Sequence, residues 1–352
     1  MRVWRRPSHR LSADVNVHWS RRYHSVLRWS RVLPPQAFNP VGTGTIDGNA
    51  VVPPDPTLSG GSVRDQRNTE WYVRDQWTLT QALNLWLGLR HTRIQSTDSG
   101  AGIDGVSQHF TTPWLAASLQ LDERTLVYAS AGEGIETTVT PNLPTYENPN
   151  QALPALKSRQ FEFGIKHDAG PLTLSAIAFD IRKPLFTDVC PALCTRVLDG
   201  RQRHRGVELD ANWRGGAWTV EGSATALKAR RERSLDPAND GRKPTNVPER
   251  SLRAQVGYQL PVWPELTLTA SVKHEDSRVV LPDNSASIPS WTTLDLGARL
   301  EQRLAGTTLT WRLGVDNATD KRAWRESPYQ FNHAYLYPLA PRTWRASVQA
   351  AF

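Results

Sequence analysis

Two cysteines, Cys190 and Cys194, are the residues of this chain whose types and spacing most readily suggest chemistry. A metal site would need further ligands nearby, and the nearest histidine is His204. The alternative is a disulfide that closes a small loop, which an oxidising compartment would favour. The sequence therefore predicts a Cys190–Cys194 disulfide and no metal site.

Acyl transfer would need a histidine near a nucleophile, and His91, His109 and His333 are the candidates. The sequence contains no GxSxG motif, no HExxH motif and no phosphate-binding loop, and no Ser/His/Asp spacing stands out. We therefore predict no catalytic residues and no cofactor. A hydrolase remains an alternative.

Arginines crowd the N-terminus, where they could form a nucleic-acid-binding arm or a transit segment. Val15, Val17 and Trp19 alternate with polar residues there, which favours a strand. The chain also has 14 Trp, which could stack on bases. Several lie near predicted strand ends, where an interfacial girdle explains them better, namely Trp77, Trp114, Trp213, Trp218, Trp263 and Trp291. We predict no nucleic-acid partner.

The elements that must position all these residues are strands, and the last fifteen residues show this most clearly. From Arg342 onward the residues alternate, so that one face carries Arg342, Trp344, Ala346, Val348, Ala350 and Phe352. The opposite face is mainly polar. An amphipathic strand of about ten residues that ends on an aromatic residue is typical of outer-membrane barrels.

The same alternation recurs along the chain, which predicts an all-β protein. Only residues 172–181 are unclear, because Ile177 and Phe179 fall on the face that should be polar. The mean hydropathy is −0.50, and no run approaches about eighteen apolar residues, which excludes a helical membrane protein. The net charge of +8 favours anionic partners, such as lipopolysaccharide or a metal chelate, or reflects an Arg-rich codon bias.

Connection lengths distinguish a barrel from a soluble sandwich. Short turns are predicted around residues 122–124, 167–171, 214–217, 261–265 and 303–306. They alternate with long polar stretches at residues 96–111, 132–157, 182–203, 231–250, 274–290 and 318–340. Such alternation places all the tight turns at one end of the sheet and all the long loops at the other, as in outer-membrane barrels.

Counting the alternating segments gives about fifteen strands. Thirteen run from Glu70 to Phe352, and two more lie around residues 13–20 and 23–32. We predict one transmembrane antiparallel up-and-down β-barrel over residues 1–352, with strand remnants in 1–33, an extracellular loop in 34–69 and clear strands in 70–352.

Several motifs together resemble the TonB-dependent outer-membrane receptors, in particular the siderophore receptors. The closing segment is Gly314-Val315-Asp316-Asn317-Ala318-Thr319-Asp320-Lys321, followed by Tyr337, by Pro341-Arg342-Thr343-Trp344 and by the terminal Phe352. Similar stretches are Glu70 to Trp77 with Leu87 to Arg90, and Glu162 to Lys166 with Arg205 to Leu209. The resemblance spans residues 62–352 and implies the uptake of a ferric siderophore or similar scarce ligand.

The resemblance also implies roles for particular residues. Long outer loops of the family capture an anionic chelate, and the candidates here are Tyr146, Arg182, Arg196, Arg201, Arg203 and Trp324. Arg342, Trp344, Val348 and Phe352 fall in the segment that the barrel-assembly machinery recognises. The implied partners are a ferric siderophore or other metal chelate, outer-membrane lipid with lipopolysaccharide, and the assembly machinery.

The chain also departs from the family pattern. The family has a signal peptide, a plug domain with a TonB box and a 22-stranded barrel, none of which is evident in full here. We interpret the chain as an incomplete receptor barrel that lacks the plug and about seven strands. Coupling to the TonB complex requires a plug, so the chain alone is expected to be transport-incompetent. A passive porin-like channel and an outer-membrane hydrolase are the alternative functions.

Overall fold

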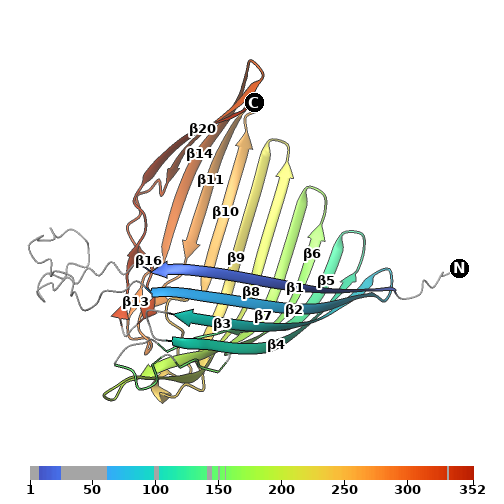
Figure 1. The fold of residues 1–352 in the computed structure, drawn as a ribbon. Coiled ribbons are helices and arrows are strands. Elements are labelled where there is room, and N and C mark those ends of the chain that lie inside the picture. The colour runs from blue at the N-terminus through green and yellow to red at the C-terminus, as the bar shows by residue number, and fades with distance from the viewer. Residues whose placement is uncertain are drawn as a thin grey trace, which may run out of the picture.

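The computed structural model describes residues 8–24, 62–98, 103–140, 145–149, 151–154, 156–330 and 333–352. These residues form one antiparallel sheet of 14 strands, in which each strand pairs with its neighbours along the chain (Figure 1). Among the same residues no helix is long and apolar enough to cross a membrane. The strands of the sheet are β1 (Ser8–His24), β2 (Ser62–Thr78), β3 (Leu83–Asp98), β4 (Ile103–Gln120), β5 (Thr125–Glu136), β6 (Leu156–Asp168), β7 (Leu172–Val189), β8 (Thr195–Gly215), β9 (Trp218–Glu232), β10 (Arg250–Gln259), β11 (Leu266–Glu275), β14 (Trp291–Leu304), β15 (Thr307–Asp316) and β20 (Thr343–Ala351).

Short elements occupy the long connections at one end of the sheet. A 3₁₀ turn spans Pro237–Asn239 between β9 and β10. Three small two-stranded ladders lie further along the chain, formed by β12 (Arg278–Val279) with β13 (Ser287–Ile288), β16 (Trp324–Glu326) with β19 (Tyr337–Pro338), and β17 (Tyr329–Gln330) with β18 (His333–Ala334). Buried apolar side chains gather here and in the other long connections, including Leu153, Val280 and Ile288.

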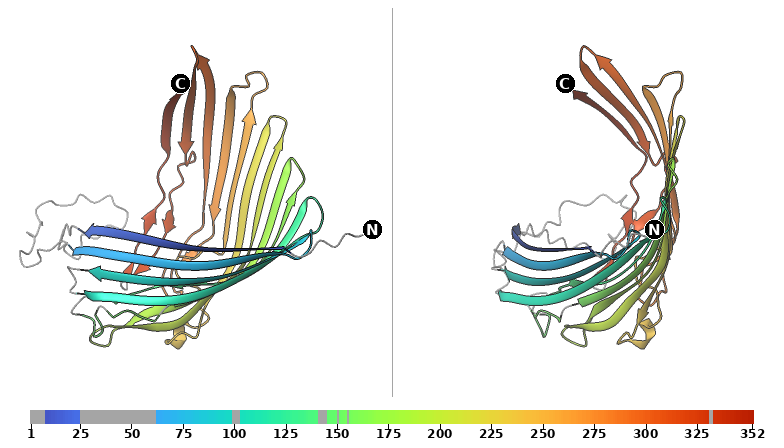
Figure 2. Two further views of the ribbon diagram at one scale, coloured as in Figure 1. Left: turned by 45° about the vertical axis from the view of Figure 1, so that its right-hand side comes forward. Right: turned by 90° about the vertical axis from the view of Figure 1, so that its right-hand side faces the viewer.

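The sheet curves into a trough whose first and last strands do not meet. In the right-hand view of Figure 2 the described strands form an open C, with β1 at one edge and β20 at the other. The thirteen strands predicted from Glu70 onward are confirmed as β2 to β20 of the sheet. Of the two further strands predicted near the N-terminus, the first corresponds to β1, and residues 25–32 of the second lie outside the described residues.

Two boundaries near the N-terminus differ from the prediction. The proposed second strand around residues 23–32 contributes Tyr23 and His24 to β1, and its remainder lies outside the described residues. Residues 62–69 of the predicted outer loop belong to β2, which begins at Ser62. Residues 34–61 lie outside the described residues.

All five predicted tight turns are present, at residues 121–124, 169–171, 216–217, 260–265 and 305–306. Two of the predicted long polar stretches are instead largely strand. Strand β3 continues to Asp98 and β4 starts at Ile103, while β7 continues to Val189 and β8 starts at Thr195. A strand that extends beyond an apolar band is wetted on both faces, so its polarity there resembles that of a loop.

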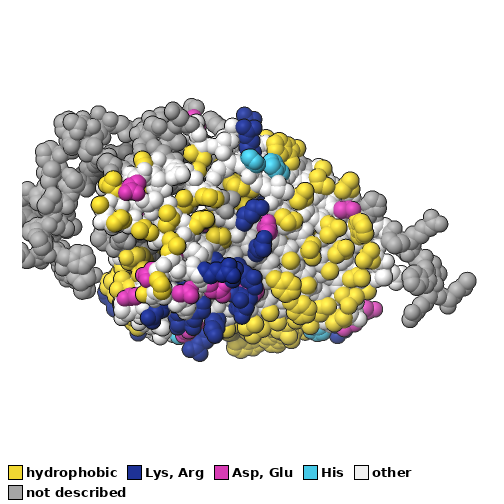
Figure 3. All heavy atoms as spheres, turned by 90° about the horizontal axis from the view of Figure 1, so that it is seen from below, with side chains coloured by type: hydrophobic (Ala, Val, Ile, Leu, Met, Phe, Trp, Pro, Cys, Tyr) yellow, Lys and Arg dark blue, Asp and Glu magenta, His cyan; other side chains and the backbone are white. Residues whose placement is uncertain are grey.

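The two faces of the sheet differ in polarity. The outer, convex face carries large apolar side chains that are about half exposed, such as Leu89 (51%), Leu209 (52%) and Leu313 (64%). Figure 3 shows these apolar groups toward the end with the tight turns, with Lys and Arg side chains in a band beside them. The inner, concave face carries the alternate, mainly polar positions. This division follows directly from the period-2 alternation in the sequence.

Aromatic residues also lie on the inner face, where glycines make room for them. Phe179 is paired with Gly206, and a Cβ atom on Gly206 would lie 2.7 Å from the Phe179 ring. The absent side chain of Gly206 thus makes room for Phe179, one of the two apolar residues at expected polar positions in residues 172–181. Trp114 lies over Gly88 in the same way, and Trp291 is buried. These two tryptophans therefore do not belong to an outer girdle, whereas Trp213 does lie exposed on the outer face.

Candidate functional site

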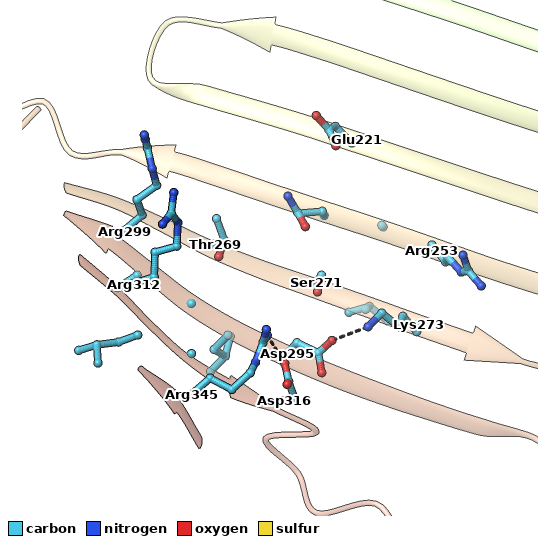
Figure 4. Close-up of a pocket in the computed structure, with 18 of the residues that line it drawn as sticks. Glu221, Arg253, Thr269, Ser271, Lys273, Asp295, Arg299, Arg312, Asp316 and Arg345 are labelled. Atoms are coloured by element: carbon cyan, nitrogen blue, oxygen red, sulfur yellow. Dashed lines mark hydrogen bonds and ion pairs between the residues drawn. The ribbon is translucent and has the colours of Figure 1, made fainter. Parts of the chain in front are cut away.

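The inner face contains a broad polar hollow between β8 and β20 with a volume of about 1110 Å³. Seven neighbouring strands contribute polar side chains to it, because every second side chain of a strand points to the same side. In Figure 4 the side chains of Lys273, Asp295 and Arg345 converge on its wall. The charged residues that line the hollow are Asp210, Glu221, Arg253, Lys273, Asp295, Arg299, Arg312, Asp316 and Arg345.

Ion pairs between adjacent strands order this wall. Lys273 Nζ lies 2.8 Å from Asp295 Oδ2, and Arg345 Nη2 lies 2.5 Å from Asp316 Oδ1. Asp295 Oδ1 also accepts a hydrogen bond of 2.8 Å from the backbone N–H of Asn317. Asn317 in turn donates from Nδ2 to the carbonyl oxygens of Lys321 and Ala340. The hollow is thus coupled to the base of the long connection between β15 and β20.

A wall of this kind can bind a polar or charged occupant through many separate contacts. It presents guanidinium, ammonium, carboxylate and hydroxyl groups from several strands. Among the described residues no three His, Cys, Asp or Glu side chains are grouped so that they could hold a metal ion. The arrangement therefore favours reversible binding or passage of a polar species.

Two of the predicted ligand residues, Tyr146 and Arg196, come together in the structure. Tyr146 Oη donates to Asp188 Oδ2 at 2.7 Å. Arg196 Nε and Nη2 donate to the two oxygens of the same carboxylate at 2.8 and 2.9 Å. Burial and the hydrogen bond to Asp188 raise the pKa of Tyr146. Tyr146 and Arg196 both hydrogen-bond to Asp188. These hydrogen bonds fasten the loop of Tyr146 to the β7–β8 hairpin.

The hairpin tip strengthens this attachment. Cys190 and Cys194 form a disulfide. The backbone N–H of Cys194 donates to the carbonyl of Thr145 at 2.7 Å, and the N–H of Glu147 donates to the carbonyl of Cys194 at 2.9 Å. Loop and hairpin therefore share backbone hydrogen bonds as well as side-chain contacts. We call Tyr146, Asp188, Arg196 and this disulfide the loop clamp.

The prediction that the candidate arginines lie in loops was wrong. Arg182 is on β7, and Arg196, Arg201 and Arg203 are on β8. Arg201 and Arg203 share the outer face with Val207 and Leu209, because all four are odd-numbered positions of one strand. Their ligand contacts stay a prediction. The predicted polar stretch at residues 182–203 covers all of these arginines but misses their strand pairing, because β8 begins within it at Thr195.

Trp324 does lie in a long connection, on the short strand β16, where it is half-buried. At the closing strand, Trp344, Val348 and Phe352 are exposed on the outer face. Arg342 precedes β20, and its backbone N–H donates to Asp320 Oδ1 at 3.0 Å. That hydrogen bond is the main cause of the lowered pKa of Asp320. The charged residues of the inner hollow are not among the predicted site residues, although they occupy polar positions of the predicted strands.

A sheet with an apolar outer face, a polar inner face, tight turns at one end and long connections at the other defines a transmembrane β-barrel of the outer-membrane type. A family model described as "TonB dependent receptor-like, beta-barrel" matches residues 4–318. The chain belongs to this family of outer-membrane receptors, and the match includes the N-terminal residues that the sequence resemblance had left out.

Individual relatives agree with this assignment. The ferrichrome receptor FcuA of Yersinia enterocolitica is 28% identical over 312 residues, which cover 84% of this chain and 41% of that protein. The crystal structure of BauA, the ferric preacinetobactin receptor of Acinetobacter baumannii, has a TM-score of 0.75 at 24% identity and covers 98% of this chain. The ferric yersiniabactin uptake receptor FyuA of Yersinia pestis has a TM-score of 0.68 at 18% identity, covering 83% of this chain and 47% of FyuA.

The chain spans about half the length of these relatives, 41% of FcuA and 51% of BauA. It therefore corresponds to the barrel portion of such receptors, which agrees with the open sheet. The likeness to the two crystal structures concerns the fold.

Proposed function

We propose that this chain supplies barrel strands and outer loops of a receptor that takes up a ferric siderophore across the outer membrane. The single observation that carries the proposal is the polar inner face beneath long connections, in a chain of this family. The relatives named above as ferrichrome, preacinetobactin and yersiniabactin receptors support a chelated iron as the substrate.

The chain's own residues would act by binding and guiding. The inner hollow offers Arg253, Arg299 and Arg312, whose guanidinium groups can bind an anionic chelate or a polar plug domain. Trp324 in the connection above can stack on an aromatic or planar ligand. The proposal includes no chemical conversion, so the protein would not be an enzyme.

Tyr146 and Arg196 have a different role in this proposal. Both are well buried in the loop clamp, with Tyr146 8% exposed and the Arg196 side chain 11% exposed. Fixing the outer loops reduces the conformational entropy that ligand binding would otherwise have to remove. They would therefore act on the ligand indirectly, by holding the loop in place.

Three further partners belong to the proposal. The barrel-assembly machinery would recognise the closing strand through Trp344, Val348 and Phe352 on its outer face. Outer-membrane lipid would cover the apolar outer face. The TonB complex would couple energy to transport through a plug domain.

The proposal is tested with outer membranes that contain the complete product of the gene. Radioactive iron is supplied as ferric hydroxamate, catecholate and oxazoline-type siderophores, and both binding and uptake are measured. We expect saturable binding of one class and uptake that stops when TonB is absent. Uptake that rises in proportion to the siderophore concentration and does not depend on TonB would instead indicate a passive channel.

Trp324→Ala separates a ligand contact from a general structural effect. We expect it to weaken siderophore binding, whereas Trp311→Ala, on the outer face of β15, should leave the affinity of inserted protein unchanged. Equal affinity for Trp324→Ala and the unaltered protein would remove Trp324 from the ligand site.

A further inference from the structure

Three of the long connections meet at one residue, Asn246, which lies between β9 and β10. Its backbone N–H donates to the carbonyl oxygen of Val279 at 2.9 Å, and its Oδ1 accepts from the backbone N–H of Ser327 at 2.8 Å. Val279 belongs to β12, in the connection between β11 and β14, and Ser327 belongs to the connection between β15 and β20. Figure 1 shows β13 and β16, from these two connections, at the same end of the sheet. Asn246 therefore joins three segments that are distant in the chain.

The contact is buried and is reinforced by Arg278. Arg278 Nη1 donates to Asn246 Oδ1 at 3.1 Å, so this oxygen accepts two hydrogen bonds. The Arg278 side chain is 11% exposed and also pairs with Glu275. Ser327 is fully buried. Loss of Asn246 Oδ1 would deprive a buried N–H and a nearly buried guanidinium group of their common acceptor, which costs more than the loss of an exposed hydrogen bond.

The backbone of Asn246 fits this role. Its φ is 61°, in the left-handed region, which glycine adopts freely and which asparagine and aspartate adopt more readily than most residues. In this conformation its N–H bonds to β12 while its side chain bonds to Ser327. Substitution by glycine or aspartate therefore preserves the backbone and changes only the side chain.

Ser327 lies in the middle of a hairpin that is rich in aromatic residues. The hairpin consists of residues 323–330 and 333–339, and we call it the aromatic hairpin. The β16–β19 ladder and a 2.9 Å hydrogen bond from the N–H of Tyr335 to the carbonyl of Pro328 join its two arms. Whatever holds Ser327 thus holds both arms. The aromatic residues of the hairpin are Trp324, Tyr329, Tyr335 and Tyr337.

Hydrogen bonds hold the aromatic hairpin at its base and halfway along. At the base, Asn317 Nδ2 donates to the carbonyl oxygens of Lys321 and Ala340, both at 3.0 Å. Halfway along, Ser327 donates to Asn246. The base contact fixes where the hairpin starts. The contact at Asn246 opposes rotation about that base and therefore fixes the direction in which the hairpin extends.

We propose that Asn246 is a positioning residue of the receptor, which holds the aromatic hairpin in the orientation in which Trp324 contacts the ligand. This inference rests on the proposed function and deepens it. Fixing the hairpin before binding reduces the conformational entropy that the ligand would otherwise have to remove. Asn246 acts through the hairpin and not by contacting the ligand, because its Oδ1 is already bonded to Ser327 and Arg278.

The test uses the complete product of the gene in lipid nanodiscs, with a nitroxide label on the exposed hairpin position Ala334→Cys. Cys190 and Cys194 are disulfide-bonded and do not react with the label. Asn246→Gly removes the acceptor, whereas Asn246→Asp retains it. Asn284→Gly is the matched control. The mobility of the label is measured by electron paramagnetic resonance.

Asn284 suits the control because it resembles Asn246 in conformation and role. Its φ is 62°. Its Oδ1 accepts from the N–H of Lys243 at 2.8 Å, and its Nδ2 donates to the carbonyl of Lys243 at 2.9 Å. These bonds join the β9–β10 connection to the β12–β13 turn and do not involve the aromatic hairpin. A general loosening of the connections would follow from either glycine variant, but a loss of hairpin position would follow only from Asn246→Gly.

We expect the label to be clearly more mobile in Asn246→Gly than in the otherwise unaltered protein. Its mobility in Asn246→Asp and in Asn284→Gly should stay close to that of the unaltered protein. The proposal is overturned by unchanged mobility in Asn246→Gly, by a failure of Asn246→Asp to retain the low mobility, or by an equal increase in Asn284→Gly.

Binding of ferric hydroxamate, catecholate and oxazoline-type siderophores is measured with the same variants without the label. Asn246→Gly should lower the affinity for the bound class by about tenfold, the cost of ordering one or two side chains on binding, and Asn246→Asp should retain it. In a Trp324→Ala background Asn246→Gly should cost much less, because the two residues act through one contact. An unchanged affinity in Asn246→Gly, or equal fold losses in both backgrounds, would overturn the positioning role.

The two measurements keep this inference separate from the proposed function. If the unaltered protein binds none of the three siderophore classes, the proposed function fails. The mobility of the label then still decides whether Asn246 holds the aromatic hairpin.

Discussion

The inner and outer faces of the sheet both carry charged residues, but they balance them differently. On the inner face the pairs are one to one, as in Lys273 with Asp295 and Arg345 with Asp316. On the outer face Asp180 is shared by Arg182, Arg203 and Arg205. These inner pairs are balanced one against one, whereas on the outer face three guanidinium groups share one carboxylate. The same alternating strands thus produce one mainly polar face and one mainly apolar face.

The largest expected effect is on the outer face of the closing strand. Phe352 is fully exposed at the end of β20. Its removal should abolish most of the insertion into the outer membrane, as measured by the yield of heat-modifiable protein in membrane fractions. Ala351→Ser, on the inner face of the same strand, is the control and should insert normally. An unchanged yield after deletion of Phe352 would show that the closing aromatic residue is dispensable.

A charge placed in the apolar region tests the difference between the faces directly. Leu209→Arg should lower the free energy of unfolding by roughly 2–4 kcal/mol, the cost of an arginine at the lipid-facing midplane of a barrel. Asn212→Arg lies on the inner face of the same strand and should cost much less. Urea unfolding in lipid vesicles measures both. Equal losses would mean that the two faces meet the same solvent.

The ion pairs of the two faces should also differ in strength. Asp295, with a side chain 15% exposed, binds both Lys273 and the N–H of Asn317. Asp295→Ala should cost about 1–3 kcal/mol, because it leaves half-buried donors without a partner. Arg250→Ala removes a 75% exposed partner and should cost less than Asp295→Ala, because water screens an exposed ion pair. The reverse order, measured by the same unfolding method, would contradict the contrast between the faces.

The smallest expected effect is the pH dependence of stability at Glu249, directly before β10. The hydrogen bond from Lys243, 2.8 Å away, is the main cause of the lowered pKa of Glu249. Stability from this pair is fully present above the unfolded pKa of about 4.3 and is lost as the pH falls through the lower folded value. The side chain is 39% exposed, so Glu249→Gln should cost less than about 1 kcal/mol at pH 7.

At pH 3 the difference between Glu249→Gln and the unaltered protein should shrink, as measured by thermal unfolding at both pH values. Lys166→Gln, on β6, is the control and should show no such pH dependence. A stability difference that stays constant from pH 7 to pH 3 would show that the ion pair of Glu249 with Lys243 does not stabilise the fold.

Much of the fold could be predicted because strand alternation is a local property. The residues around Leu209 and Leu313 predict an apolar face without any knowledge of their partners. The ends of the strands are harder to predict from the sequence. The sequence predicts a loop at Arg182 and Arg201, because beyond the apolar region both faces of a strand are wet. Hydrophobic alternation disappears there, although the ladder continues.

The candidate site was less predictable. Tyr146 and Arg196 were selected for their chemical types, but their shared partner Asp188 comes from a neighbouring strand, and local patterns do not reveal such a contact. The inner-face pair of Lys273 and Asp295 likewise depends on the register between β11 and β14.

By itself, the sequence determined the all-β class, the thirteen strands from Glu70 onward, the tight turns and the family resemblance, because alternation and turn residues act over a few neighbouring positions. Only the tertiary structure decided which strand ends project beyond the membrane, how the loop clamp forms, and that Arg182, Arg203 and Arg205 converge on Asp180. Those features depend on pairing between strands and on the curvature of the sheet, which bring together residues that are distant in the chain.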